Sequence, residues 1–563
     1  MRSNPRPTSN PPHGFRGPFF SDFPTRSAYS EGAGPYRIVP EAVAVPRDID
    51  DLLLLLQHAR DTGGSLVPRG AGSGMPGNNV GHGTVMDLRN FSGPMAVSAQ
   101  GTANVGAAAT WGALDRVAEP MGLRLPSNPS SGAVCMLGGM VATNAAGPRV
   151  RAGNIRRWVR GVELVTADGE VGWFGRHATR RGPRTRRAGE QVTHDVRLAA
   201  LQRFAQQVRP AIDLARAEIL ARFPKTTKNS SGYALDHFLA TGDILDLIIG
   251  SEGTLGVVTR VELALEPRPA GSAALLLGLS SLKVLPGVVE DLLTLEPAAV
   301  ELLDRSFLAL AAPQLPFPAK DLEVSLLVEF EGDDDAAAAS AVRRAAGQVN
   351  DRCTHCEPAL SDAERRRVWA VRHAASPALA ALPSSRRSLQ IIEDGCVPVR
   401  SLDRYLAGVR AAAERHSLEV VAFGHAGDGH LHVNALPDVD GANFEKRLAA
   451  LLDDVTDLIC ELGGTMSGEH GDGRLRAPLL QRVYGAHIAG LFADVKRAFD
   501  PRGILNPGVI VPADDAGSLT DLKVGRGAQP IPADIEARLR EVERAAAWDR
   551  VKSDMALESR ASA

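Results

Sequence analysis

Cysteine is scarce in this chain and poorly arranged for cross-linking. The sequence has five cysteines among 563 residues, an odd number spread thinly along its length. Such spacing is a poor framework for disulfides and fits a reducing compartment, so we expect a cytoplasmic protein. The one C-x-x-C segment, residues 353–356, has no second pair with which it could hold zinc, and we assign it no role.

Long apolar runs and an excess of one charge are also missing. No stretch approaches the roughly 18 apolar residues that span a bilayer, and the N-terminal residues, rich in Pro, Ser and Arg, lack the apolar core of a signal peptide. The net charge is only −3, which gives no reason to bind nucleic acid or an acidic membrane surface. We therefore expect a small-molecule partner, no nucleic acid and no transmembrane segment.

Apolar residues are plentiful. They make up 44% of the chain, and at this length more than one core is needed to bury them, so we expect at least two domains. Short strands and helices alternate up to about residue 265, which is typical of an α/β or α+β domain. Beyond about residue 270 we expect an antiparallel sheet with helices on one face. The expected strands there are residues 273–279, 324–330, 389–392 and 420–423, and the expected helices are residues 333–349, 401–416 and 446–462.

Two segments outside this pattern have open roles. Residues 176–187 hold six arginines and little to bury, which favours a solvated surface insertion over a docking patch for an acidic partner. The tail after residue 513 is polar, with one amphipathic helix predicted after Pro532. The sequence leaves open whether that helix packs on its own chain or on a partner.

Three glycine-rich segments lie in the first half, at residues 69–78, 126–147 and 250–256. Successive glycine amides can wrap an anion because no Cβ keeps the phosphate oxygens away. The chain has neither G-x-G-x-x-G at the start of a helix nor G-x-x-x-x-G-K-[ST], so a Rossmann or P-loop site is not indicated. One such segment is most often a plain turn, whereas three in one domain favour a phosphate-bearing ligand.

Histidines gather in the second half. After the turn at residues 427–429, strand alternation places His430, His432 and Asn434 on one face. A helix over residues 446–462 then leads to Glu469 and His470. A single histidine would most often be a hydrogen-bonded core residue, but the cluster with a glutamate favours a divalent-metal site for zinc or another first-row ion that keeps one coordination position open.

Six motifs occur together in an order that resembles the FAD-linked oxidase family, in the branch with D-lactate, glycolate and D-2-hydroxyglutarate dehydrogenases. The resemblance implies an α+β protein with a two-subdomain FAD-binding domain of the p-cresol methylhydroxylase and vanillyl-alcohol oxidase type. It also implies a substrate domain with a ferredoxin-like antiparallel sheet. The expected divisions are a flexible segment 1–35, the FAD domain 36–268, the substrate domain with the metal site 269–512, and a polar tail 513–563. The motifs are residues 67–74, 137–147, 250–256, 424–434, 468–471 and 499–508.

The resemblance also implies roles for individual residues. His425, His432 and Glu469 match the family's metal ligands, His470 its proton acceptor, and Arg372 its clamp for the substrate carboxylate. The residues matched to FAD binding are Pro68, Arg69, Gly70, Ala71, Gly72, Ser73, Gly74, Gly77, Asn78, Gly138, Gly139, Asn144, Gly147, Glu252, Gly253, Thr254 and Val258.

Several positions depart from the family pattern. Ser73 stands where covalent relatives carry a histidine, so we expect dissociable FAD. Met136 replaces a frequent threonine, and His430 replaces a common asparagine and could compete as a ligand. Ile392 stands where D-2-hydroxyglutarate members carry a lysine, so a second substrate carboxylate is not indicated. No cysteine follows Cys460, which excludes the iron–sulfur cluster of some long relatives from this chain.

The resemblance thus predicts FAD-dependent oxidation of a small D-2-hydroxy acid, such as D-lactate or glycolate, to the 2-keto acid. Hydride would pass to flavin N5, assisted by a divalent metal, zinc being the expected ion, and by a histidine base. A separate acceptor would take the electrons, either a quinone, a cytochrome, an iron–sulfur protein or an electron-transfer flavoprotein. The protein could work at the inner face of the membrane and as a homodimer. The alternatives are a flavin-binding subunit of a larger electron-transfer complex and an alcohol or ether-lipid enzyme of the same fold.

Overall fold

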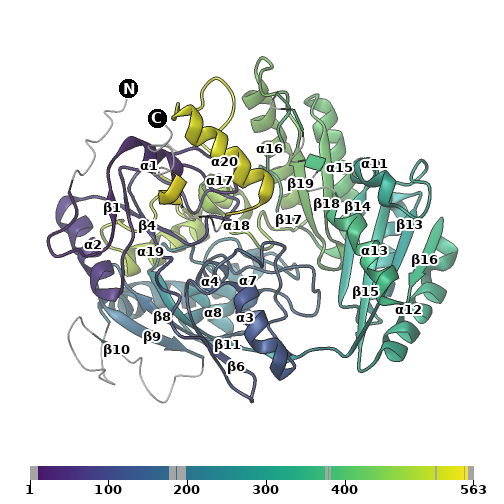
Figure 1. Cartoon of the computed structure of the whole chain (residues 1–563), viewed down its shortest axis with the longest axis horizontal. Coiled ribbons are helices and arrows are strands. Elements are labelled where there is room, and N and C mark those ends of the chain that lie inside the picture. Colours follow the sequence, from purple (N-terminus) through teal and green to yellow (C-terminus); the bar gives the residue numbers. More distant parts are fainter. Residues whose placement is uncertain are drawn as a thin grey trace.

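Sheets of different build organise the two halves of the chain (Figure 1). The computed structural model describes residues 10–176, 185–186, 198–374, 378–379, 382–383, 385–513, 517–548, 550 and 552–555. Within these residues, no helix combines the length and apolar character needed to cross a membrane. Most of the arginine-rich segment 176–187 lies outside the described residues.

The first sheet is small and mixed. Three of its four strands are parallel, and a helix that begins where the Asp48 side chain accepts a hydrogen bond from the Asp51 amide connects two of these three. That helix ends at Gly63, whose φ of 72° favours glycine. The sheet order is β1 (Phe19–Phe20), β2 (Ala42–Ala44), β4 (Thr84–Asp87) and β3 (Leu66–Arg69), with α2 over Ile49–Thr62.

The second sheet is antiparallel and includes the hairpin predicted around Asp168–Gly169. Gly169 has φ 81° in the turn, as such a tight connection requires. The sheet order is β10 (Thr185–Arg186), β9 (Val171–Gly175), β8 (Val159–Val165), β11 (Val257–Ala264), β6 (Thr102–Gly106) and β5 (Ala96–Val97). Around it lie α3 (Trp111–Ala118), α4 (Leu137–Thr143), α5 (Ala199–Arg203), α6 (Arg209–Leu214), α7 (Arg216–Arg222), α8 (Leu235–Thr241), α9 (Leu245–Ile248), β7 (Leu123–Arg124) and β12 (Glu266–Pro267).

The third sheet is the seven-stranded antiparallel sheet of the second half. The expected strand 389–392 is wrong: Leu389 makes one isolated bridge to Ala435, and the edge strand forms later. Residues 391–394 instead turn and point Glu393 and Asp394 at the histidines. The sheet order is β16 (His355–Ala359), β13 (Gly271–Leu279), β15 (Val324–Gly332), β14 (Ala299–Asp304), β18 (Val420–His425), β19 (His430–Ala435) and β17 (Gly395–Cys396).

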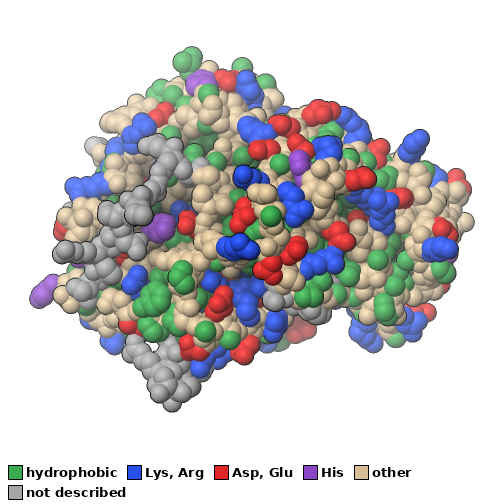
Figure 2. Space-filling view, turned by 90° about the horizontal axis from the view of Figure 1, so that it is seen from above, with side chains coloured by type: hydrophobic (Ala, Val, Ile, Leu, Met, Phe, Trp, Pro, Cys, Tyr) green, Lys and Arg blue, Asp and Glu red, His purple; other side chains and the backbone are tan. Residues whose placement is uncertain are grey.

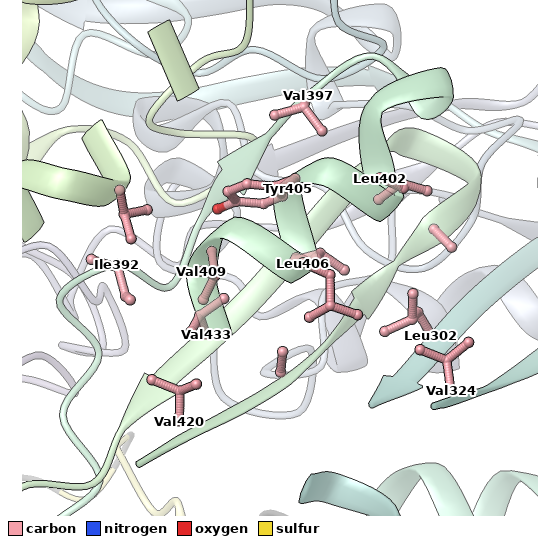
Figure 3. Close-up of a cluster of buried hydrophobic side chains, with 14 of the residues drawn as sticks. Leu302, Val324, Ile392, Val397, Leu402, Tyr405, Leu406, Val409, Val420 and Val433 are labelled. Carbon is pink, nitrogen blue, oxygen red and sulfur yellow. The ribbon is translucent and has the colours of Figure 1, made fainter. Parts of the chain in front are cut away.

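Helices cover both faces of this sheet, so the expectation of one covered face is wrong. The reason is that the central strands carry apolar side chains on both faces of the sheet. Leu326 packs in one core cluster, and its neighbour Leu327, which points to the opposite face, packs in another. In Figure 3, strand residues such as Val433 face Leu406 and Val409 of a covering helix. One face carries α10 (Leu285–Leu293), α12 (Asp335–Val349), α15 (Leu402–Arg415) and α16 (Phe444–Glu461), and the other carries α11 (Arg305–Ala311) and α13 (Asp362–His373).

Both ends of the described part of the chain pack on the first half. Residues 10–35 differ from the flexible segment expected, because β1 pairs with β2 and the helix α1 (Phe23–Ala28) is held by the C-terminal helix α20 (Ala533–Ala545). In Figure 1 the yellow α20 lies across the purple N-terminal segment. The tail helix therefore packs on its own chain. The remaining helices are α17 (Gly473–Arg476), α18 (Leu480–Tyr484) and α19 (Ala486–Phe499).

Candidate functional site

A cavity of about 1600 Å³ receives residues from both halves of the chain. Its walls include the glycine loop after β3, the start of α4, and His425 of β18 and His432 of β19. Typical ligand pockets measure roughly 300 to 1000 Å³, so this cavity has room for a large cofactor beside a small substrate.

The glycine-rich segments form the wall of the cavity in the first half. Gly72 has φ 85°, which turns the loop sharply, and a Cβ on Gly139 would meet no atom within 4 Å, so backbone is open to the cavity there. Exposed amides of this kind suit the phosphates of a dinucleotide such as FAD. The predicted FAD residues that line the cavity are Pro68, Arg69, Gly70, Ala71, Gly72, Ser73, Gly74, Asn78, Gly138, Gly139, Gly147, Glu252, Gly253 and Val258.

Three predicted FAD residues do not line the cavity and instead shape its wall. Gly77, with φ 79°, packs so closely on Tyr36 that a Cβ would lie 2.5 Å from its ring. Asn144 ends α4 in the left-handed region, and its side chain accepts a hydrogen bond from the Arg156 amide. The Thr254 hydroxyl lies 2.7 Å from that of Tyr233.

Two predicted FAD residues line the cavity, but their side chains form hydrogen bonds within the protein. The buried guanidinium of Arg69 donates to the carbonyls of Tyr29 and Glu31, which fixes the loop that follows. The Glu252 carboxylate accepts hydrogen bonds from the Asn78 amide group at 2.9 Å and from the Asp472 backbone at 2.7 Å. Glu252 thus ties the glycine loop to the segment that carries Glu469.

The histidine hairpin assembles a group of metal-ligand atoms. β18 ends at His425, which lies opposite His430 in the sheet register, and alternation along β19 brings His432 to the same face. The His425 Nε2 atom lies 3.2 Å from both His432 Nε2 and Glu469 Oε1, and the last two are 3.6 Å apart. Ligands bound at about 2.1 Å to a tetrahedral ion lie about 3.4 Å apart, so these three atoms fit one face of a zinc site.

Neighbouring groups orient these three side chains. His425 Nδ1 lies 2.5 Å from Glu301 Oε1, His432 Nδ1 lies 3.0 Å from the Glu393 carbonyl, and the ammonium of Lys228 lies 2.9 Å from Glu469 Oε2. Such partners fix the tautomer of a ligating histidine and the direction of a ligating carboxylate. The Nε2 atoms of both histidines are thereby left for an ion.

Charge compensation lowers the pKa of two buried acids at this site, Glu301 and Glu469. Burial alone would raise the pKa of Glu301, but the His425 ring and the Arg372 guanidinium outweigh it and lower the pKa to about 2. Burial alone would lower the pKa of Lys228, but the Asp428 and Glu469 carboxylates raise it. The Glu469 carboxylate is therefore available as an anionic ligand.

His470 lies beside this group and reaches the cavity. Its Nδ1 atom is 2.7 Å from Glu393 Oε2, and its ring stacks on that of His432 with centroids 5.3 Å apart. Burial alone would lower its pKa, but the Glu393 and Asp394 carboxylates raise the pKa to about 10. A bound cation would act in the opposite direction and favour the neutral base.

Arg372 reaches the same cavity from α13. Its Nε donates to Glu301 Oε2 at 2.8 Å, and its guanidinium lies 4.7 Å from the centre of the Phe423 ring. The predicted clamp, base and metal ligands therefore share one wall of the cavity.

Sequence reasoning missed the residues that support the site. Glu301 is an acid in the middle of the otherwise apolar and wholly buried part of strand β14, which is unusual for such a position and hence a signal that was present. Glu393 and Asp394 follow the strand expected over 389–392, and nothing in that pattern predicted that they would turn towards the histidines. Lys228 lies outside the six motifs, and its partner Glu469 is 241 residues away, so spacing gave no means of pairing them.

Comparisons with known proteins cover both halves of the chain. Residues 40–175 match the FAD binding domain, and residues 269–510 match the C-terminal domain of FAD linked oxidases. The glycolate oxidase subunit GlcD of Bacillus subtilis (strain 168) is 27% identical over 500 residues, covering 87% of this chain and 93% of the relative. The D-lactate dehydrogenase of Archaeoglobus fulgidus is 26% identical over 87% of this chain and 96% of its own length. A D-2-hydroxyglutarate dehydrogenase of Xanthomonas citri pv. viticola is 29% identical, covering 85% of this chain and 90% of the relative.

Solved structures show the same fold. The 4-ethylphenol oxidase from Gulosibacter chungangensis superposes with a TM-score of 0.61 at 16% identity, covering 87% of this chain and 92% of that one. An alkyldihydroxyacetonephosphate synthase superposes with a TM-score of 0.54 at 15% identity, covering 87% of this chain and 82% of that one. These two likenesses bear on the fold alone. With both halves matched in order, the chain belongs to the FAD-linked oxidase family, in the branch of the D-lactate, glycolate and D-2-hydroxyglutarate dehydrogenases.

Proposed function

We propose that this protein binds FAD non-covalently together with a divalent metal ion, zinc by its donor set, and oxidises a small D-2-hydroxy acid to the 2-keto acid. One observation carries the proposal: the ligand atoms of His425, His432 and Glu469, 3.2 to 3.6 Å apart, line the same cavity as the glycine loop. D-Lactate and glycolate are substrates of the right size and charge.

The protein's own residues would bind, orient and deprotonate the substrate. When bound, FAD supplies the hydride acceptor and the ion supplies a Lewis acid for the substrate hydroxyl. Arg372 pairs with the substrate carboxylate, its direction fixed by Glu301. His470 takes the hydroxyl proton at Nε2, because Glu393 holds its Nδ1–H.

The electrons would leave to a separate acceptor. The neighbours in the family include a protein described as a subunit, the GlcD of Bacillus subtilis, so transfer to a partner is one route. A quinone, a cytochrome, an iron–sulfur protein or an electron-transfer flavoprotein would each serve as a one- or two-electron acceptor.

The substrate class is tested by anaerobic bleaching of the flavin absorbance against a panel of D- and L-2-hydroxy acids, before and after chelation. We expect rapid bleaching by a D-2-hydroxy acid, slower or no bleaching by its L enantiomer, and loss of bleaching after chelation with recovery on adding Zn²⁺. Bleaching by simple alcohols, with no response to hydroxy acids, would contradict the proposal.

A further inference from the structure

His430 is the buried member of the histidine group. It begins β19, is wholly buried, and lies behind the wall of the cavity that His425, His432 and Glu469 line. A nitrogen in this place can approach an ion only from the protein side.

The hydrogen bonding of His430 leaves one nitrogen lone pair unused. Nε2 lies 2.7 Å from Asp394 Oδ1, and since an ionised carboxylate can only accept, Nε2 carries the proton. The other nitrogen, Nδ1, has no hydrogen-bond partner among the described residues although it is buried. A buried acceptor without a partner costs folding free energy unless something else binds it.

The unused nitrogen faces the proposed ion site. His430 Nδ1 lies 3.9 Å from Glu469 Oε2, and the ligand atoms of His425, His430, His432 and Glu469 all lie within 4.8 Å of one another. Gly468 permits this position, because a Cβ there would come within 2.8 Å of the His430 ring. The carboxylate–histidine pairing with Asp394 is also the arrangement that orients metal-bound imidazoles.

We propose that His430 Nδ1 is a fourth protein ligand of the ion, closing its buried side while the cavity side stays open to substrate. The inference rests on the metal site of the proposed function. Three imidazoles and one carboxylate make a donor set suited to zinc and other first-row ions. The ion would then hold its place without substrate, and the substrate oxygen would enter as a fifth ligand.

The test compares wild type with His430→Asn, which keeps a donor for Asp394 but removes the imidazole. X-ray absorption spectroscopy of the zinc-loaded holoprotein should count three imidazoles in wild type and two in the variant. The affinity of the FAD-bound, metal-free protein for Zn²⁺, measured by competition with a chromophoric chelator, should fall by at least about 100-fold. His416→Asn is the matched control, because His416 also pairs with an aspartate, Asp454, at 2.8 Å but lies away from the cavity.

Two results would overturn the inference. Two imidazoles in the wild-type spectrum would exclude His430 without any need for the variant to fold, and would leave the three-ligand site standing. An unchanged Zn²⁺ affinity in a folded His430→Asn protein would likewise exclude His430 as a ligand. A wild-type protein that takes up no stoichiometric Zn²⁺ would instead remove the metal from the proposed function, and this inference with it.

Discussion

At the scale of single residues, Lys228 links the two halves of the site. Its ammonium is wholly buried and lies between the carboxylates of Asp428 and Glu469, at 3.2 and 2.9 Å. It also donates to the Gly147 carbonyl in the glycine-rich segment. One lysine thus connects the wall proposed to hold FAD with the proposed metal ligand. Without it, the Asp428 carboxylate would lose this ion pair, and the Glu469 carboxylate would be left to the neighbouring histidines.

Lys228→Met removes this charge while keeping most of the volume. Removing one partner of a buried ion pair costs about 3 to 5 kcal/mol, so the free energy of unfolding should fall by roughly that amount. Urea unfolding of the variant beside Lys225→Met, a change at an exposed lysine, measures the effect. A loss below about 1 kcal/mol would mean that the ion pairs contribute little.

His470→Ala tests the proposed base. A positioned base contributes about 10² to 10⁴ in rate, so the rate constant of flavin reduction by substrate should fall by at least about 100-fold while FAD stays bound. Stopped-flow absorbance measures the rate, and His487→Ala, at an exposed histidine on α19, is the control. Reduction near the wild-type rate would remove His470 from the mechanism.

At the scale of elements, the β18–β19 hairpin does most to assemble the site, and it was the most predictable part. Strand alternation correctly placed His430 and His432 together, and the helix that was expected to lead to Glu469 is α16. The strand prediction failed at residues 389–392. Only Leu389 of this segment makes a bridge to the sheet, and the chain then turns and brings Glu393 and Asp394 into contact with the histidines. Whether such a segment pairs as a strand or turns to make side-chain contacts depends on residues distant in the sequence, which a local pattern does not include.

Asp246 joins several elements of the first half. Its carboxylate, on α9, pairs with Arg156 at 3.0 Å and with Arg176, after β9, at 2.9 Å. Burial alone would raise the pKa of Asp246, but hydrogen bonds and charge from Arg176 and Arg156 lower it to about 2. A lowered pKa means that the stabilisation is complete above about pH 4 and is lost as the pH falls towards 2.

Asp246→Asn should therefore remove part of the acid sensitivity of folding. We expect wild type to exceed the variant in unfolding free energy by about 2 kcal/mol or more at pH 6, with the gap narrowing between pH 4 and 3. Urea unfolding at a series of pH values measures this. A gap that stays constant over that range would show that the carboxylate is not ionised preferentially in the folded state.

At the scale of the whole molecule, the tail joins both halves across the cavity. Glu543 of α20 pairs with Lys523 at 2.8 Å and with Arg387 of the second half at 2.7 Å. The end of the helix, through Trp548, lines the cavity near Val134. Figure 2, which views the molecule from above Figure 1, shows acidic and basic side chains interspersed rather than separated by sign. The tail is thus part of the cavity wall, which its polar composition did not predict.

Trp548→Ala should loosen that wall. The side chain packs with Ala28, Ile535 and Val542, so its removal should weaken both the packing of the tail and the retention of FAD, by about tenfold in Kd for a loss of about 1.4 kcal/mol. Fluorescence titration of the apoprotein with FAD measures the affinity. Deletion of residues 556–563 is the control. Equal FAD affinity in Trp548→Ala would show that the tail does not support the cofactor site.

The central claim is that FAD and a metal ion held by His425, His432 and Glu469 act in one cavity. The most direct test determines metal content by elemental analysis and anaerobic flavin bleaching on the same samples of wild type and His425→Ala. We predict one ion and one FAD in wild type, and in the variant FAD without the ion and without bleaching by D-2-hydroxy acids. A variant that keeps a full complement of metal, or a colourless wild type that takes up no FAD, would contradict the account.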